Sequence, residues 1–138
     1  MLQVVLDPNV FVSAVVKPDG VSAAVVRAGL AGRFRLVVSP ALIAELSSVL
    51  RRPKFADYAT LDEVSALLDA VFGASERHED LPTGEPVIGD PGDAYLVGLA
   101  VSAQVDLVVS GDHDLHDALE GQLDVLTPGE FLLVLKGE

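Results

Sequence analysis

Short runs of apolar residues recur along the chain, with longer segments of helical spacing between them. Four of these runs predict strands buried on both faces, because their apolar residues are consecutive rather than alternating. They are residues 2–6 (LQVVL), 35–39 (RLVVS), 106–110 (DLVVS) and 123–127 (LDVLT). A fifth, short strand is expected near residues 76–79, within an otherwise irregular segment from 73 to 89. The run at 10–16 (VFVSAVV) fits a strand or a helix, and its pattern leaves both open.

Helices are expected between the strands, and several begin with a recognisable N-terminal signal. Ser39 followed by Pro40 is an N-cap with proline at the first helical position. Two Thr-x-x-Glu capping boxes begin at Thr60 and Thr127. The predicted helices cover residues 21–30, 40–52, 61–72, 91–103, 114–120 and 128 onward. Strands separated by helices predict a three-layer α/β/α fold with a central, mostly parallel sheet of about five strands, in a single domain spanning residues 1–138.

The composition narrows the class of protein. Half of the 138 residues are apolar, which excludes intrinsic disorder. No stretch approaches 18 uninterrupted apolar residues, so no membrane span is expected. The first residues lack a basic region and reach an acid at Asp7, which argues against a signal peptide. The absence of cysteine excludes a disulfide scaffold, a thiolate metal site and a cysteine nucleophile, and it fits a cytoplasmic location.

The charge balance is strongly acidic. Nine Lys and Arg residues face 21 Asp and Glu residues, so the formal net charge is −12. A protein with this negative charge repels nucleic acid unless bound cations or a local basic patch neutralise it. The densest basic run is Arg51, Arg52 and Lys54, and a second one is Arg33 with Arg35. These residues could contact a phosphate backbone, although a solvated helix end that favours cations explains them more simply.

Acidic side chains are expected to gather at one edge of the predicted sheet. Asp7 follows the first strand and Asp112 follows the third, and the carboxyl ends of parallel strands meet at one edge. Glu45 lies on the helix after the second strand and borders its apolar stripe. Asp93 begins the helix before the third strand and shares its buried face, but topology does not determine which end of that helix meets the site.

Carboxylates placed together repel one another, so they must share protons, pair with basic residues or hold a cation. His113 is the nearest basic residue in the sequence. A hard divalent cation such as Mg²⁺ or Mn²⁺ is the simplest solution, because carboxylate and water oxygens suit it. Each acid also has an ordinary explanation. Asp7 could be simply a turn former, and Glu45 could be an ordinary surface residue. Asp93 could belong to a capping box with Asp90, and Asp112 and Asp114 could cap a short helix.

Five segments together form a recognisable pattern: VVLDPNVFVSAVV, LVVSPALIAELSSVLRRPKF, DPGDAYLVGLA, VDLVVSGDHDL and VLTPGEFL. In order and spacing these segments resemble the PIN-domain family, and the nearest resemblance is to VapC-like toxins of toxin–antitoxin systems. The resemblance implies that the family's four acids fall on Asp7, Glu45, Asp93 and Asp112. It also implies an accessory acid at Asp114, and small polar positions at Asn9 and Ser110 that support the carboxylates. Pro8 departs from the family, which usually has Thr or Ser there and so gains a hydroxyl and a backbone donor.

The resemblance further implies an activity and partners. It predicts an endoribonuclease that uses one or two Mg²⁺ or Mn²⁺ ions to activate water against RNA phosphodiester bonds. It predicts a cognate antitoxin, and a homodimer is expected as well. Two other classes remain open: a non-catalytic PIN-like binding module, and a phosphoacceptor-type α/β signalling domain with an acidic Mg²⁺ pocket.

Overall fold

The computed structural model describes residues 1–80 and 94–137. Its strands are β1 (Gln3–Leu6), β2 (Arg35–Val38), β3 (Ser75–Arg77), β4 (Leu107–Val109) and β5 (Asp124–Leu126). Its helices are α1 (Pro8–Val16), α2 (Val21–Leu30), α3 (Pro40–Leu50), α4 (Leu61–Ala74), α5 (Ala94–Ser102), α6 (His113–Leu119) and α7 (Pro128–Lys136), with a 3₁₀ turn η1 (Pro53–Phe55). The five strands form one sheet in the order β3-β2-β1-β4-β5, and every neighbouring pair is parallel. The predicted fold class is confirmed.

Strand β1 lies at the centre of the sheet because it is apolar along its whole buried length. Val4, Val5 and Leu6 are at most 1% exposed. The chain continues from β1 to β2 on one side, whereas β4 pairs with β1 on the other side. The strand order therefore reverses beside β1. In open α/β sheets, ligands bind at the carboxyl ends of strands next to such a reversal.

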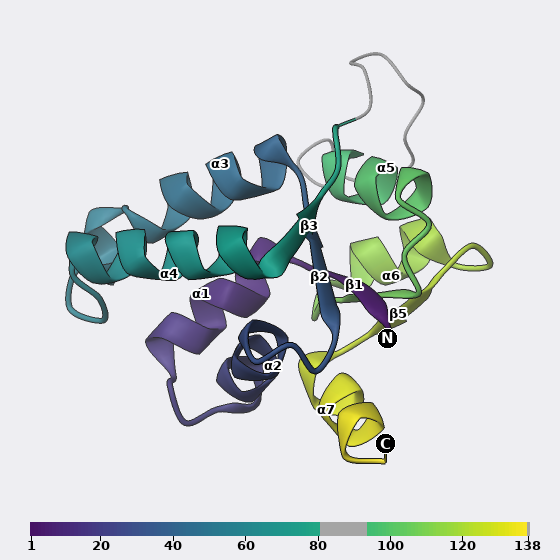
Figure 1. Ribbon diagram of the computed structural model, residues 1–138, viewed down its shortest axis with the longest axis horizontal. Coiled ribbons are helices and arrows are strands. Elements are labelled where there is room, and N and C mark those ends of the chain that lie inside the picture. Colours follow the sequence, from purple (N-terminus) through teal and green to yellow (C-terminus); the bar gives the residue numbers. More distant parts are fainter. Residues whose placement is uncertain (81–93, 138) are drawn as a thin grey trace.

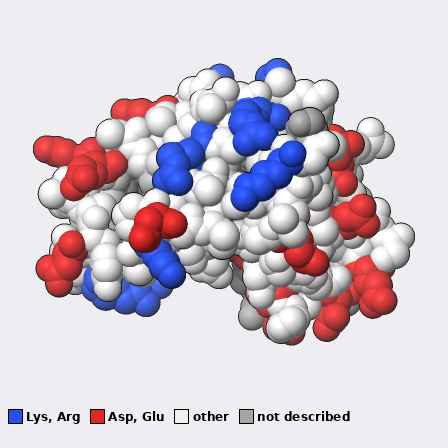
Figure 2. Space-filling model, turned by 90° about the horizontal axis from the view of Figure 1, so that it is seen from below, with Lys and Arg blue, Asp and Glu red and all other residues white. Residues whose placement is uncertain are grey.

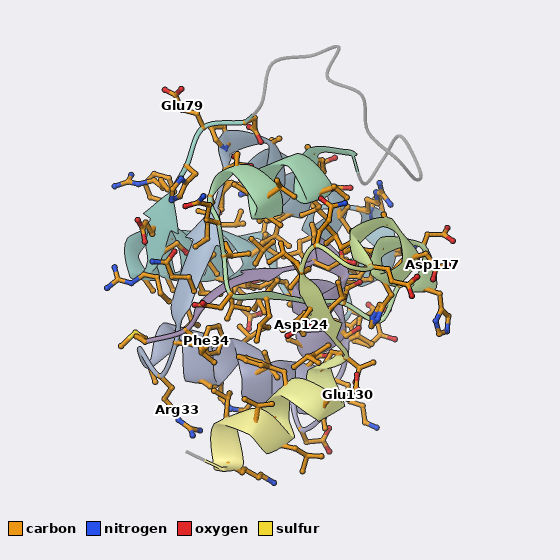
Figure 3. The ribbon with its side chains drawn as sticks, turned by 90° about the vertical axis from the view of Figure 1, so that its right-hand side faces the viewer. Arg33, Phe34, Glu79, Asp117, Asp124 and Glu130 are labelled. Carbon is orange, nitrogen blue, oxygen red and sulfur yellow. The ribbon has the colours of Figure 1, made fainter. Side chains whose placement is uncertain are left out.

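Helices cover both faces of the sheet. In Figure 1, α1, α2 and α4 lie to the left of the strands, and α5 and α6 lie to the right. Helix α2 packs on both α1 and α7. The rings of Phe34 and Phe131 meet edge to face with centroids 4.9 Å apart, and Arg33 donates to the Leu135 carbonyl at 2.9 Å (Figure 3). These contacts fasten the C-terminal helix to the start of β2.

Gly29 allows α2 to approach the sheet closely. A Cβ atom there would lie 2.9 Å from the Phe34 ring and 3.2 Å from Leu36. Those distances are shorter than van der Waals contact, and both neighbours are about 1% exposed and cannot move aside. A side chain at this position would therefore push α2 away from β2.

The structure resolves or corrects several element boundaries. The ambiguous run at 10–16 belongs to helix α1. Helix α3 ends at Leu50, earlier than predicted, and η1 follows it. Strand β3 is Ser75–Arg77 rather than 76–79, and α6 begins at His113. The predicted start of the helix near residue 91 lies outside the described residues.

Helices α1 and α2 are apolar, but both are short. They meet at a bend of 113°. Within residues 1–80 and 94–137, no single helix is long and apolar enough to cross a membrane. Taken together, α1 and α2 reach the length and apolar composition of a membrane span, but the bend divides them.

Candidate active site

Asp7 is held at the carboxyl end of β1 by hydrogen bonds to its N–H and to both carboxylate oxygens. Its N–H donates to the Val109 carbonyl at 3.0 Å, which continues the β1–β4 pairing past the strands. Its Oδ1 accepts the Asn9 N–H at 2.9 Å and so caps α1. Its Oδ2 accepts the Ser110 hydroxyl at 2.8 Å. The side chain is only 4% exposed, so its orientation is tightly constrained.

Pro8 is compatible with this arrangement. It occupies the first turn of α1, where a backbone N–H would have no helical partner. Its fixed φ also suits a helix start. The Asn9 N–H caps α1 by donating to the Asp7 carboxylate. Relative to the usual family residue, Pro8 lacks a hydroxyl and a backbone N–H.

The Ser110 hydroxyl links two of the predicted carboxylate residues. It donates to Asp7 and accepts the Asp112 N–H at 3.0 Å, and the side chain is fully buried. Asp112 caps α6, because its Oδ1 accepts the Asp114 N–H at 2.9 Å. The His116 ring lies 2.9 Å from the Ser110 carbonyl through Nε2. The loop after β4 is therefore fixed against the end of β1.

Asp7 and Asp112 line one pocket of about 270 Å³. Asp114 stands on the exposed first turn of α6 and contacts Asp112 through its backbone N–H. Asp114 is not among the residues that line the pocket in the described part of the chain. The two strand-end acids predicted to share an edge are thus brought together.

Glu45 joins this group from α3. Burial raises the pKa of its carboxyl group, and the negative charge of Asp7 raises it further, while the positive charge of Arg52 acts in the opposite direction. Its Oε2 accepts a hydrogen bond from the Tyr95 hydroxyl on α5. Glu45 therefore lies within the electrostatic reach of Asp7 and accepts a hydrogen bond from a tyrosine.

Not all of the predicted set can be placed. Asp93 lies outside the described residues. Within residues 1–80 and 94–137, no three acidic or histidine side chains come close enough to form a metal cluster on their own. The described part of the site is the pair Asp7 and Asp112, with Glu45 coupled to Asp7 through its charge.

The two predicted basic groups lie at different places. Arg35 begins β2 and pairs with Gln3 at the start of β1, so it lies at the amino edge of the sheet, opposite Asp7. Figure 2 shows Lys and Arg gathered on the face seen from below, and Figure 3 places Arg33 at that lower end beside α7. Arg52, in contrast, affects the pKa of Glu45 and therefore lies nearer the acids.

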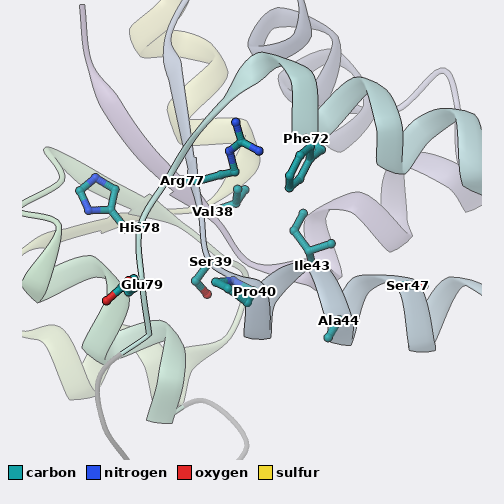
Figure 4. A pocket seen from close by; sticks show the side chains of 10 residues that line it. All are labelled: Val38, Ser39, Pro40, Ile43, Ala44, Ser47, Phe72, Arg77, His78 and Glu79. Carbon is teal, nitrogen blue, oxygen red and sulfur yellow. The ribbon is translucent and has the colours of Figure 1, made fainter.

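A larger pocket of about 490 Å³ lies apart from the acids. It is lined almost wholly by apolar surface between α3, the end of α4 and β3 (Figure 4). Ile43 and Phe72 face it, and the guanidinium of Arg77 stacks over the Phe72 ring at 4.2 Å. Neither Asp7, Asp112 nor Glu45 lines it. The sequence pattern did not predict this hollow, because it depends on how α4 crosses α3.

The family model of the PIN domain matches residues 3–114. The chain belongs to the PIN domain family. The matched segment runs from β1 into α6 and includes every predicted carboxylate, from Asp7 to Asp114. PIN domains are generally nucleases, so family membership supports a hydrolase. No curated protein matches the chain.

Solved structures share this PIN fold at low sequence identity. The crystal structure of PAE2754 from Pyrobaculum aerophilum is 18% identical with a TM-score of 0.70, over 100% of this chain and 91% of that one. The crystal structure of VapBC2 from Rickettsia felis, bound to a DNA fragment from their promoter, is 12% identical with a TM-score of 0.63, over 91% and 98%. At these identities the likeness shows the fold alone.

The donors of the PIN site suit a divalent cation. Asp7 and Asp112 supply carboxylate oxygens to the pocket, and Mg²⁺ and Mn²⁺ prefer such ligands. Among the described residues, the one ion pair is His78 with Glu76, so Asp7 has no cationic side chain beside it there. Asp7 is a buried carboxylate close to a second acid. A bound cation would therefore stabilise its negative charge strongly.

Tyr95 is the site residue that the sequence analysis missed. It lies on α5, and its hydroxyl reaches Glu45 on α3, 50 positions away in the sequence. The only signal was a polar hydroxyl in the apolar segment YLVGLA, and core tyrosines are common enough to make that signal weak. The contact depends on how α3 and α5 pack, which periodicity does not reveal.

Proposed function

We propose that this PIN domain is a Mg²⁺- or Mn²⁺-dependent endoribonuclease that hydrolyses phosphodiester bonds in RNA. The observation that carries the proposal is the buried Asp7 carboxylate, which shares a pocket with Asp112 beside the central strand. Burial and the negative charge of Asp7 raise the pKa of Glu45, so a third carboxylate lies close enough to interact with Asp7. We include Asp93 as the fourth acid on the family resemblance.

In this proposal Asp7, Glu45, Asp93 and Asp112 hold one or two ions, and Asp114 assists. A divalent ion there would supply Lewis acidity and lower the pKa of a water molecule. The protein's own contribution is to fix the oxygens in advance. The Ser110 hydroxyl and the Asn9 N–H orient the two oxygens of Asp7, and the Tyr95 hydroxyl orients Glu45. Preorganised ligands need no costly rearrangement when the cation or the substrate arrives.

The phosphoacceptor alternative lacks a residue that it needs. Such domains place a lysine at the end of a later strand. The three lysines of this chain lie at the end of α1 (Lys17), in η1 (Lys54) and at the end of α7 (Lys136). None follows a strand, so the acidic pocket is better explained as a nuclease site.

We also propose a toxin role, with a cognate antitoxin as partner, in the cytoplasm where its RNA substrate is found. Support comes from the shared fold with a VapBC2 complex. We further expect a homodimer, because Leu133 and Val134 on α7 are 70% and 41% exposed and such apolar surface favours association. Light scattering at tens of micromolar should give twice the mass of one chain, and the mass of a monomer would contradict this expectation.

The nuclease proposal is tested with single-stranded RNA. The protein should cleave it with Mn²⁺ or Mg²⁺ and stop when EDTA is added. Asp7→Asn should lose activity by at least about 100-fold, because a ligand charge is removed at the buried position. Asp69→Asn is the matched control, since Asp69 is exposed on α4, away from the pocket. Equal cleavage in EDTA, or by the Asp7 variant, would refute the proposal.

A further inference from the structure

The polar residues that line the pocket beside Asp7 and Asp112 are of two chemical kinds. The first kind is the two carboxylates that follow β1 and β4. The second kind, called the second wall below, is neutral: Asn9 and Ser13 on α1, and Ser22 on α2. Ser13 is exposed and Ser22 is half-buried, so both hydroxyl groups are accessible to a ligand in the pocket.

The second wall is unsuited to a phosphate group. No Lys or Arg lines the pocket among the residues that the structure describes, and the nearby carboxylates repel an anion. Amide and hydroxyl groups instead match neutral donors and acceptors, because each of them can both donate and accept a hydrogen bond. The ligand group that fits this wall is therefore polar but uncharged.

The size and the remaining lining point to a single base. The volume of about 270 Å³ lies just below the roughly 300–1,000 Å³ of pockets for drug-sized ligands, so it suits one nucleoside rather than a stretch of RNA. Pro128 adds apolar surface against which a planar ring can pack. Single-stranded RNA is recognised in this way, by bases that are splayed out, packed on side chains and hydrogen-bonded along their edges.

We propose that this pocket is a nucleobase subsite, which binds the base next to the scissile phosphate and reads its edge through Ser13 and Ser22. The inference rests on the proposed nuclease function and adds the determinant of its sequence preference. The acids line the same pocket, so with the divalent ion of the proposed function held between them the phosphate attached to that base would lie beside Asp7 and Asp112. The enzyme should therefore prefer one base at the position next to the cleaved bond.

The first test is cleavage of a short RNA library randomised on both sides of the cut. The double variant Ser13→Ala with Ser22→Ala should reduce the preference for the favoured base by about 2- to 10-fold per lost hydrogen bond, while cleavage of the other bases continues. Ser102→Ala is the matched control, because Ser102 is exposed at the end of α5. An unchanged preference in the double variant would overturn the subsite.

The second test separates the subsite from the nuclease function. Free nucleosides are uncharged, so their binding needs no metal and no catalysis, and saturation-transfer NMR detects it in EDTA. Wild type should show transfer to one nucleoside more strongly than to the others, and the double variant should lose that difference. Absence of nucleoside binding to wild type would overturn the subsite even if RNA is cleaved. Nucleoside binding without RNA cleavage would overturn the nuclease function and leave the subsite standing.

Discussion

At the scale of single residues, a small polar side chain, Ser110, orients the acidic residues of the site. Ser110 is fully buried, and its one hydroxyl contacts both Asp7 and the Asp112 backbone. Buried hydrogen bonds to a charged group are stronger than neutral ones, at about 1.5–3 kcal/mol. This explains how a 4% exposed carboxylate is tolerated without a basic partner in the described residues.

The structure makes a specific prediction for Asp7→Asn in the absence of metal. The variant relieves the repulsion with Glu45, but it weakens the charge-assisted bond from Ser110. These effects oppose each other, so we expect the free energy of unfolding to change by no more than about 1 kcal/mol. Added Mn²⁺ should raise the melting temperature of wild type, because it binds only the folded state, and should leave the variant nearly unchanged. Equal shifts in both proteins would show that Asp7 only stabilises its turn.

Tyr95 is predicted to act as a positioning residue for Glu45. Tyr95→Phe keeps the ring and removes the hydroxyl that donates to Oε2. We expect Mn²⁺ affinity, measured by calorimetry, to fall about 10-fold, as is typical when a group that orients a ligand is lost. Tyr58→Phe is the matched control, since Tyr58 is 53% exposed. Unchanged Mn²⁺ affinity in the Tyr95 variant would contradict the prediction.

At the scale of elements, the sequence predicted what local chemistry determines. The N-cap at Ser39 and the capping boxes at Thr60 and Thr127 predicted the starts of α3, α4 and α7, and the structure confirms their hydrogen bonds. The run at 10–16 stayed ambiguous because its periodicity was weak. Its helical form is explained by the Asp7 side chain and by Pro8 in the first turn, whereas the sequence analysis considered Asp7 as a site acid or a turn former and not as the cap of this helix.

The candidate site also has features that the sequence predicted and features that it did not. Asp7 and Asp112 were predicted to meet, because parallel strands bring their ends to one edge of the sheet. The contact between Tyr95 and Glu45 was not predicted, because it depends on the packing of two helices that are distant in sequence. Arg33 and Arg35 were grouped with possible RNA contacts on composition alone, whereas β2 carries Arg35 at the opposite edge.

The capping box of α7 predicts a dependence of stability on pH. The hydrogen bond from the Thr127 N–H lowers the pKa of Glu130 below 4.5, and the Thr127 side chain adds to this. The folded protein therefore gains stability above the ordinary pKa of the group and loses it as the pH falls through the lowered value.

The matched comparison is Glu130→Gln, which keeps an acceptor oxygen but cannot ionise. Wild type should be the more stable protein near pH 6, and the difference should shrink towards pH 3 in urea unfolding followed by circular dichroism. Thr127→Ala, which removes the cap itself, should cost about 1 kcal/mol near neutral pH. A difference between wild type and Glu130→Gln that does not vary with pH would contradict the prediction.

At the scale of the whole molecule, the net charge of −12 is unevenly distributed. Figure 2 shows basic side chains gathered on the face seen from below, and Arg35 lies at the edge of the sheet opposite Asp7. Nearer the acids, Arg52 acts electrostatically on Glu45, and Arg51 is held by Ser47 and Ser65. The cations that could assist RNA binding at the site are therefore few.

This distribution predicts which arginines contribute to RNA binding. Arg51→Ala with Arg52→Ala should weaken binding and reduce the slope of log affinity against log salt by about 1.4, since each phosphate contact on single strands contributes about 0.7. Arg33→Ala with Arg35→Ala is the comparison, and it should leave the slope unchanged because Arg35 lies at the opposite edge of the sheet. Fluorescence anisotropy over a salt series measures both slopes. A larger change for the Arg33 and Arg35 pair would reverse the assignment.

The hydrogen bond from Ser110 to Asp7 joins residues 103 positions apart, and this separation affects when the protein becomes active during its synthesis. Asp7 and Glu45 are synthesised early, but β4 must also be synthesised before it can pair with β1. About four-fifths of the 138 residues must therefore be translated before Ser110 and Asp112 can complete the edge. If RNA is the substrate, as we propose, the nascent chain is harmless to its own messenger until translation is nearly finished.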